Sequence, residues 1–325
     1  MIQPLVSASP ETIQYRSLLG AIQLARGNLG QAEQQFLRVL AISPQDPAAS
    51  KMLAETRLRQ QRPSAALDAL LAVQDMAADD PHIGLLTGIA TVLSGNPEQG
   101  LLYLEEAAAL DPGNELLKLQ LARAYLAVNR DEEASKILAD SFGDDASAVE
   151  AKLLRLVTEG RQKNIDSATA VAEELIADYP EDARVLTAVA VHYQLNGETG
   201  RARELFERAA KLDSRDVTAR LFVAASLVQE GRRDDAESLL RQTVQGQPEN
   251  AQALAGLAQL LASRGAMDEA AELFGRAAER TTSVMPRLAL IQIRLRQGQV
   301  AEAKRQLETA ASAAPDNPEV LALEG

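Results

Sequence analysis

The chain has 325 residues, of which 46% are apolar and only 3% aromatic, and it contains no cysteine. Its net charge is −13 and its isoelectric point is near 4.8. Nucleic-acid binding is therefore not expected, because affinity for phosphate backbones depends on clustered Lys and Arg. Neither a stretch of about twenty apolar residues nor a secretory signal is visible, so no membrane span is predicted for this segment. The absence of cysteine excludes disulfides and thiolate sites but leaves the cellular compartment unknown.

A period of 34 residues runs through the sequence from residue 13 to residue 317. It is marked by a small residue that recurs at spacings of 34 seven times and 33 once, at Ala32, Ala66, Gly100, Ala134, Ala168, Ala202, Ala236, Ala270 and Ala303. An apolar residue follows four positions later in each unit, as at Phe36 and Phe206, and offsets of four and seven place residues on one helix face. The period therefore predicts nine helical hairpins and an all-α fold.

Turn-forming residues divide each unit into two helices. The predicted ends of the first helices carry residues that adopt left-handed backbone conformations, at Gly27, Gly95, Asn129, Gly197, Gly231, Gly265 and Gly298. The predicted ends of the second helices carry proline, which cannot continue a helix, at Pro44, Pro112, Pro180, Pro248 and Pro315. The connections between helices are therefore predicted to be short.

The fifth unit, near residues 149–182, departs from this pattern. Counting back from Pro180 places Arg155 at an inward position, whereas the neighbouring apolar residues fit a frame about two residues earlier. We expect a distorted repeat in which Gly160 ends the first helix and a longer turn follows it. A surface insertion or a docking irregularity would each account for such a distortion.

Both ends of the sequence look like parts of further repeats. Residues 1–12 resemble the end of a preceding repeat, and residues 318–325 resemble the start of a truncated tenth one. Natural arrays usually finish with a polar capping helix. The sequence is therefore interpreted as a fragment of a longer protein.

The unit as a whole resembles the tetratricopeptide repeat (TPR). It has small residues at positions 8 and 20, a large residue at position 24, a smaller one at position 27 and proline at position 32. The resemblance covers residues 13–317, although position 4 lacks the family's tryptophan and carries residues such as Arg16 and Lys118. It implies a right-handed superhelical solenoid of about nine helix-turn-helix repeats. It also implies a non-catalytic scaffold that binds a protein or peptide on its concave surface.

In the TPR family the concave surface is formed by positions 2, 5, 9, 12 and 13 of each repeat. In the third and fourth repeats these positions are unusually apolar, and they carry His82, Leu85, Ile89, Val92 and Leu93, and then Leu116, Leu119, Arg123, Leu126 and Ala127. The predicted partner-binding residues among them are His82, Leu85, Ile89, Val92, Leu119, Arg123 and Leu126. Such an apolar strip is typical of a surface that binds an amphipathic helix or an extended peptide. The alternative is that superhelical winding or a neighbouring chain buries it.

The sequence holds no motif for catalysis, a cofactor or a metal. His82 and His192 are its only histidines, and the HExxH, GxxxxGK[ST] and GxSxG patterns are all absent. We therefore predict no enzyme activity, no cofactor and no metal site, and a protein or peptide as partner.

A finer hypothesis concerns the pathway. Segments such as residues 18–46, rich in Ala, Leu and Gln, resemble the bacterial TPR lipoproteins that accompany PEP-CTERM and exopolysaccharide export systems. That resemblance implies the cell envelope and a role in polysaccharide synthesis or export, with the cytoplasm not excluded. Two alternatives stay open: a targeting arm of an enzyme whose catalytic domain is missing, and a self-assembly module.

Overall fold

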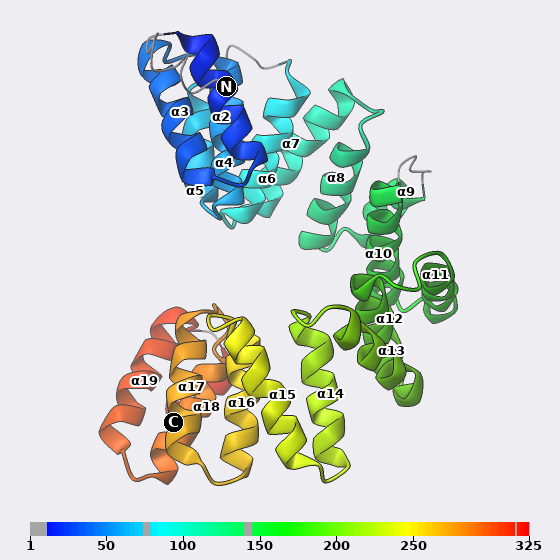
Figure 1. Cartoon of the computed structure of the whole chain (residues 1–325), viewed down its shortest axis with the longest axis vertical. Helices are drawn as coiled ribbons and strands as arrows, with labels where there is room; N and C mark the ends of the chain where they lie inside the picture. Colours follow the sequence, from blue (N-terminus) through cyan, green and yellow to red (C-terminus); the bar gives the residue numbers. More distant parts are fainter. Residues whose placement is uncertain (1–11, 74–78, 140–144, 316, 325) are drawn as a thin grey trace. The chain divides into compact units, whose positions relative to one another are not determined.

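The computed structural model describes residues 12–73, 79–139, 145–315 and 317–324. Within these ranges the chain consists of α-helices joined by turns and loops, without a β-strand (Figure 1). No helix in these ranges is long and apolar enough to cross a membrane. The predicted end of a preceding repeat, at residues 1–12, lies outside the described residues except for Thr12.

The chain divides into two compact units, Met1–Val171 and Ala172–Gly325, with the boundary inside α11 (Ile165–Asp178). Unit 1 contains α2 (Ile13–Ala25), α3 (Leu29–Ile42), α4 (Pro47–Arg59), α5 (Pro63–Leu71), α6 (Pro81–Leu93), α7 (Pro97–Leu110), α8 (Glu115–Ala127), α9 (Asp131–Leu138) and α10 (Asp145–Arg161). Unit 2 contains α12 (Ala183–Leu195), α13 (Thr199–Leu212), α14 (Val217–Gln229), α15 (Arg233–Gly246), α16 (Ala251–Ser263), α17 (Met267–Glu279), α18 (Met285–Arg296), α19 (Val300–Ala313) and α20 (Pro318–Glu324).

Successive helices pack as hairpins, and each hairpin packs on the next within its unit. The pairs α2–α3, α4–α5, α6–α7 and α8–α9 are in contact in unit 1, and α12–α13, α14–α15, α16–α17 and α18–α19 in unit 2. The segment predicted to start a tenth repeat forms α20, whose Val320 is fully buried and packs in one cluster with Ala310 of α19. The all-α hairpin array predicted from the 34-residue period is confirmed.

The small residues that define the period lie where two helices approach most closely. All nine are buried, and the eight alanines among them are at most 2% exposed. In the α6–α7 hairpin, a Cβ atom added to Gly88 would lie 2.5 Å from Cγ of Leu104, and one added to Gly100 would lie 2.5 Å from Cγ2 of Val92. A larger residue at these places would therefore separate the two helices, because packed interiors leave no spare volume.

The turn inside each hairpin contains one residue with a positive φ angle. Among the described residues these are Gly27, Gln61, Gly95, Asn129, Lys163, Gly197, Gly231, Gly265 and Gly298, at spacings of 34 residues with a single 33. The seven positions predicted from glycine and asparagine are confirmed. Gln61 and Lys163 adopt the same conformation although their side chains disfavour it, so the geometry of the hairpin overrides local preference at these two turns.

The fifth repeat keeps the common frame, contrary to the predicted shift of two residues. Helix α10 continues through Gly160 to Arg161, so the prediction that Gly160 ends this helix is wrong. The positive-φ residue is Lys163, in register with the other turns. Arg155 occupies the inward position eight before the turn residue and is half-buried, next to the buried Leu156.

What distinguishes the fifth repeat is its start. In six other repeats an Asp or Asn accepts a hydrogen bond from a backbone N–H in the first turn of the first helix, whereas α2 and α18 begin without a side-chain cap. The six caps are Asp46, Asp80, Asn114, Asp182, Asp216 and Asn250. Such caps fix where a helix begins. The corresponding residue of the fifth repeat is Ala148, which has no side-chain acceptor, and α10 begins earlier, at Asp145. The preceding α9 is correspondingly short, with 8 residues against 14 in α7.

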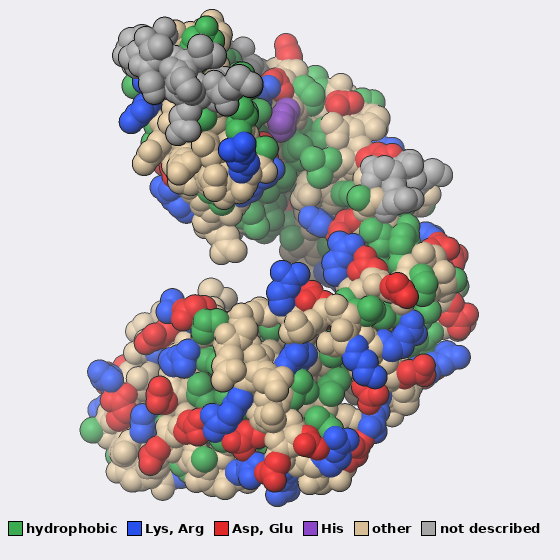
Figure 2. All heavy atoms as spheres, in the orientation of Figure 1, with side chains coloured by type: hydrophobic (Ala, Val, Ile, Leu, Met, Phe, Trp, Pro, Cys, Tyr) green, Lys and Arg blue, Asp and Glu red, His purple; other side chains and the backbone are tan. Residues whose placement is uncertain are grey.

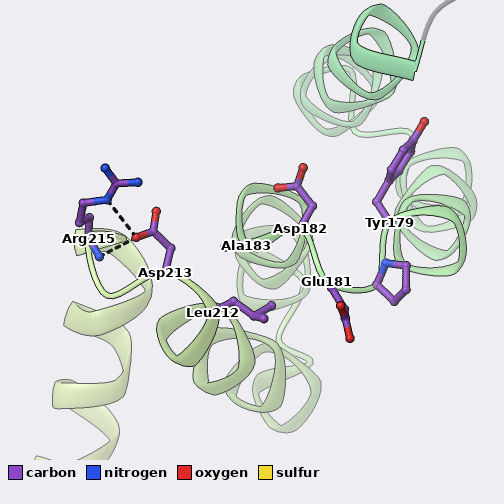
Figure 3. Close-up of a pocket in the computed structure, with 8 residues that line it drawn as sticks. Tyr179, Glu181, Asp182, Ala183, Leu212, Asp213 and Arg215 are labelled. Atoms are coloured by element: carbon purple, nitrogen blue, oxygen red, sulfur yellow. Dashed lines mark hydrogen bonds and ion pairs between the residues drawn. The ribbon is translucent and has the colours of Figure 1, made fainter.

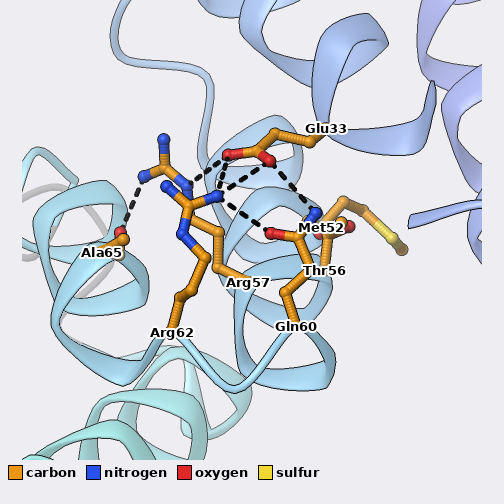
Figure 4. A network of polar contacts seen from close by, with 7 residues as sticks. All are labelled: Glu33, Met52, Thr56, Arg57, Gln60, Arg62 and Ala65. Carbon is orange, nitrogen blue, oxygen red and sulfur yellow. Dashed lines mark hydrogen bonds and ion pairs between the residues drawn. The ribbon is translucent and has the colours of Figure 1, made fainter. Parts of the chain in front are cut away.

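Polar side chains tie neighbouring hairpins together at the turns. In unit 1 the carboxylate of Glu33 on α3 accepts hydrogen bonds from Arg57 and Gln60 at 3.1 Å and from Arg62 at 3.0 Å (Figure 4). Arg57 also donates to the carbonyl of Ala65 at 2.7 Å. Partial burial opposes ionisation of Glu33, but these hydrogen bonds and the positive charges of the two arginines outweigh it and lower its pKa. The network therefore links α3 to the α4–α5 turn.

Candidate functional site

Helix α16 is the most unusual helix of unit 2, because residues 251–263 include no charged residue. One of its faces is buried in the core through residues such as Leu254, Leu257 and Leu261. Its opposite face carries the exposed Gln252 and Gln259 among small residues. A helix at the surface of a globular protein usually has a charged face, so an uncharged open face indicates a surface that meets another molecule.

That open face forms the middle of a groove of about 1000 Å³, which also involves α14 and α18. Its floor comes from core residues that are less than 10% exposed, namely Leu240, Leu260, Phe274 and Ile293. Its walls include small residues of the three helices, such as Ala225, Ala255 and Ala289. Because these side chains are short, the space above the floor stays open.

Gly256 sets the depth of the groove between α14 and α16. A Cβ atom added there would lie 2.2 Å from Cδ2 of Leu221 on α14. The glycine therefore lets the Leu221 side chain lie flat against α16. A larger residue would push Leu221 out into the groove.

The rim of the groove is polar but almost uncharged. Four glutamines, Gln229, Gln252, Gln259 and Gln292, line it with exposed side chains, and none of them bonds to a described residue. Among the described residues, Arg296 at the end of α18 is the one charged residue that lines the groove, and no Asp or Glu does. Arg296 likewise makes no ion pair or hydrogen bond to any described residue. In a chain of net charge −13, this groove is an uncharged to weakly positive surface.

A smaller cleft of about 310 Å³ continues the groove toward α13 and shares Phe222, Ala225 and Gln229 with it. Phe222 stacks on Phe206, with ring centroids 4.0 Å apart and planes inclined by 8°. Arg203 lines this cleft but is neutralised by ion pairs with Glu207 at 3.0 Å and with Glu230. The two ends of the combined surface therefore differ, since only the α18 end has an unpaired positive charge.

The surface of unit 2 away from the groove is of the ordinary kind. Acidic and basic side chains alternate over α17 and α19 (Figure 2). Many of these charges are paired, as in the contact of Arg305 with Glu302 at 2.8 Å. Such mixed, exposed pairs are typical of solvated helix faces.

The partner-binding residues predicted from the sequence lie on α6 and α8 in unit 1, where most of the apolar ones pack inward. Leu85, Leu119 and Leu126 are 4%, 5% and 8% exposed. Leu119 packs in one cluster with Leu138 of α9 and Ala151 of α10, whereas Leu85 and Leu126 belong to the core of α6, α7 and α8. Ile89 and Val92 are half-buried against the same core. These leucines are not accessible to a partner in this conformation.

The remaining members of the predicted set are accessible. His82 is exposed at the start of α6, and Arg123 is exposed on α8, where it forms an ion pair with Glu150. Hydrophobic side chains do gather on the surface over α6, α7 and α8 (Figure 2), and they include Leu93 and Leu116, which are 61% and 51% exposed. The predicted apolar strip is therefore exposed at Leu93 and Leu116 and buried at its other leucines.

A depression of about 700 Å³ lies between the loops that precede α12 and α14 (Figure 3). Its carboxylates are already engaged: Asp182 accepts a hydrogen bond from Arg184 at 2.6 Å, and Asp213 accepts one from the backbone N–H of Arg215 at 2.8 Å. The Arg184 hydrogen bond lowers the pKa of Asp182, and the Arg215 backbone hydrogen bond lowers that of Asp213. These acids therefore hold the turns rather than face a ligand, and within the described ranges no group of three His, Cys, Asp or Glu residues could hold a metal ion.

Comparison with known proteins shows the family to which this helical array belongs. A family model described as "Tetratricopeptide repeat" matches residues 23–88, 92–155, 193–260, 227–284 and 261–325, and a second model of the same description matches residues 158–217. The chain belongs to the tetratricopeptide repeat family. TPR arrays are in general non-catalytic scaffolds for protein interaction. No curated protein matches the sequence.

Solved structures agree with the TPR assignment. A crystal structure of a TPR protein from Parabacteroides merdae has a TM-score of 0.63 at 15% identity, covering 77% of this chain and 98% of that one. A human IFIT1 dimer with PPP-AAAA has a TM-score of 0.50 at 17% identity, covering 82% of this chain and 73% of that one. At these identities the likeness shows the TPR fold alone.

The residues predicted from the sequence and the residues that line the groove of unit 2 occupy the same positions of the TPR repeat. The seven predicted residues lie 136 residues, or four repeats, before Thr218, Leu221, Ala225, Val228, Ala255, Gln259 and Ala262. All seven of these later residues line the groove of unit 2. The TPR positions that the sequence argument used are therefore those that form the groove, but in the seventh and eighth repeats instead of the third and fourth.

The groove residues of α16 were not predicted from the sequence, although the sequence contains a feature that marks them. Large apolar side chains at the groove positions are the ones that fill the space between adjacent helices. Small residues and glutamines at the same positions, as at Ala255, Gln259 and Ala262, leave the space open. An uncharged helix in an acidic chain would have pointed to α16.

Proposed function

We propose that the protein is a non-catalytic scaffold that binds a segment of a partner protein in the groove of α14, α16 and α18. The observation that carries the proposal is the groove itself, about 1000 Å³ in volume, with a core-like floor and a mostly uncharged rim on three successive first helices. Pockets of this size, mostly apolar with a few polar groups at the rim, are those that bind ligands and peptide side chains.

The fold supports a binding role over an enzymatic one. The groove offers amide, hydroxyl and guanidinium groups but no carboxylate, histidine or cysteine to act as acid, base or nucleophile. Binding by shape and hydrogen bonds is what such a lining can provide.

The groove can be tested by replacing its open alanines with the leucines that unit 1 has at the same repeat positions. A random peptide library is selected against the whole chain, and the selected peptides are then titrated against the variant Ala255→Leu, Ala262→Leu. We expect at least tenfold weaker binding, because the new side chains occupy the space above the floor. Circular dichroism checks that the helices and the melting temperature are kept.

The matched control is Ala301→Leu, which adds the same side chain at an exposed position of α19 outside the groove. It should leave peptide affinity unchanged. Equal affinity for the wild type and the groove-filled double variant would refute the groove as the binding site.

The pathway proposal concerns envelope polysaccharide synthesis or export. It is supported only by the likeness of repeat segments such as residues 18–46 to bacterial TPR lipoproteins of those systems. Its test is capture of partners from envelope and cytoplasmic fractions of the source organism, with the groove-filled variant beside the wild type. Partners from another process that are lost with the variant would overturn the pathway while keeping the scaffold function.

A further inference from the structure

We infer that the groove of unit 2 takes an extended, apolar polypeptide segment that carries at least one carboxylate, placed near Arg296. This inference rests on the proposed function, since it names the chemistry of the segment that the same groove would bind. Two separate observations support it: the charge of the groove and the character of its polar side chains.

The charge observation concerns the α18 end of the groove. Residues 280–301 contain four arginines and no acidic residue. Arg287 and Arg294 are occupied by hydrogen bonds to Gln306 and Gln297, at 2.8 Å and 3.2 Å. Arg296, by contrast, lines the groove without a partner among the described residues. A guanidinium with free donors at the end of an apolar groove matches a carboxylate, which can accept two of its hydrogen bonds at once.

The absence of acidic side chains from the lining strengthens this choice. The chain has 46 Asp and Glu residues against 33 Lys and Arg, yet no Asp or Glu of the described ranges lines the groove. A basic segment would find its only charged neighbour to be another cation, which is unfavourable where water is partly excluded. The groove therefore discriminates against a basic segment and favours an acidic one.

The amide observation concerns the conformation of the segment. Gln252 and Gln259 of α16 and Gln292 of α18 face the groove with both donors and acceptors unused by described residues. An extended backbone has free N–H and C=O groups that need such partners, whereas a helix satisfies its own along most of its length. Neutral amides that flank apolar pockets thus fit an extended segment, with alternate side chains directed to the floor.

Both features can be tested with peptides selected from a random 12-residue phage library against the whole wild-type chain. We expect the selected peptides to combine apolar residues with Asp or Glu and to tolerate proline, which prevents helix formation. Affinities are then measured by fluorescence anisotropy for the wild type and for Arg296→Glu. The acidic peptides should bind Arg296→Glu about three- to tenfold more weakly, and replacing their Asp or Glu by Lys should restore binding to this variant.

The control for charge is Arg26→Glu. Arg26 is also an exposed arginine at the end of a first helix, directly before the turn glycine Gly27, but it lies in unit 1. This substitution changes the net charge and the charge at the helix end in the same way. It should leave the affinity for the selected peptides unchanged, and an equal loss in both variants would show a long-range effect of net charge and overturn the role of Arg296.

The control for conformation is the double variant Gln259→Leu, Gln292→Leu. An extended segment loses its backbone hydrogen bonds to these amides and should bind several-fold more weakly, whereas a helix packed by its apolar face should bind equally well or more tightly. Selected peptides that are basic, or that bind the Leu variant more tightly, would overturn the inference. If Ala255→Leu, Ala262→Leu still binds the peptides, the groove is refuted as the binding site. If that variant loses binding but Arg296→Glu keeps it, only the inference about charge is refuted.

Discussion

Units 1 and 2 are built from the same repeat, yet the same repeat positions are closed in one and open in the other. In unit 1, Leu119 and Leu126 of α8 are buried at 5% and 8% exposure. In unit 2, the equivalent residues of α16 are Ala255 and Ala262, which line a groove of about 1000 Å³. The difference indicates that in this array the size of the side chain at these positions decides whether the first helices form a core or an open groove.

The comparison also explains why the two units expose different kinds of surface. In unit 1, Leu85, Leu119 and Leu126 are buried at these positions, whereas Leu93 and Leu116 of the same predicted strip are exposed. Alanines and glycine on α16 leave a groove lined by glutamines and Arg296. Large apolar residues therefore stabilise unit 1 at the positions where small ones leave a groove open in unit 2.

The largest expected effect comes from truncating a buried leucine at one of these positions in unit 1. Leu119→Ala should lower the free energy of unfolding by about 2–5 kcal/mol, because it removes buried methyl groups and leaves a cavity between the helices. Chemical denaturation followed by circular dichroism measures the change. Since the chain has two compact units, the transition that shifts should be that of unit 1.

The neighbouring Leu116→Ala provides the control for this prediction. Leu116 lies on the same helix but is 51% exposed, so its truncation should change the free energy of unfolding by less than about 0.5 kcal/mol. If Leu119→Ala were as mild as Leu116→Ala, the strip in unit 1 would be an open surface after all.

A smaller effect should be shared by the two units, because it acts on the residue that defines the repeat. Ala66 of α5 and Ala202 of α13 stand four repeats apart, and both are fully buried. Replacing either by Leu should overpack a helix crossing and cost about 1–3 kcal/mol, measured in the same denaturation experiment. A large loss of unfolding free energy at one position with none at the other would show that the two positions are not equivalent in the 34-residue repeat.

The sequence was sufficient to predict the fold because the repeat is marked by residues with a strict steric role. Ala202 must be small for two helices to cross, and Gly197 must adopt a positive φ angle to turn the chain, so both are recognisable in the sequence. The predicted frame failed in the fifth repeat, where Lys163 takes the place of glycine and Ala148 that of a capping residue. There the neighbouring hairpins impose the geometry, which local sequence does not reveal.

The candidate site was harder to predict, because an open groove and a closed core use the same repeat positions. The sequence does not show that Leu85 packs against α8, or that Leu119 packs against α9 and α10, instead of facing solvent. Apolar character fits a binding surface, but in packed helices it first indicates burial. The small and amide side chains of α16 are a weak signal until their open face is seen next to α14 and α18.

The smallest expected effect concerns a position that is buried in both units but can ionise in only one of them. In unit 2 this position is His192 of α12, 7% exposed, and in unit 1 it is Thr56, whose hydroxyl donates to the carbonyl of Met52 at 2.7 Å. Burial disfavours the charged imidazole and lowers the pKa of His192, and the nearby Glu198 only partly opposes this. The contribution of His192 to stability is therefore complete above its unfolded pKa of about 6.5 and decreases as the pH falls below that value.

Replacing His192 by the threonine of unit 1 should remove this dependence. The free energy of unfolding of the wild type minus that of His192→Thr is measured by denaturant titration at pH 7.5, 6.5 and 5.5. We expect this difference to decrease by a fraction of a kcal/mol as the pH falls, so that the wild type loses stability relative to the variant. The reason is that the unfolded chain binds the proton more readily than the folded one. Carboxylates elsewhere titrate equally in both proteins and cancel in the difference. A difference that is constant with pH, or that shifts in favour of the wild type on acidification, would mean that the imidazole is solvated and that this position is not closed alike in the two units.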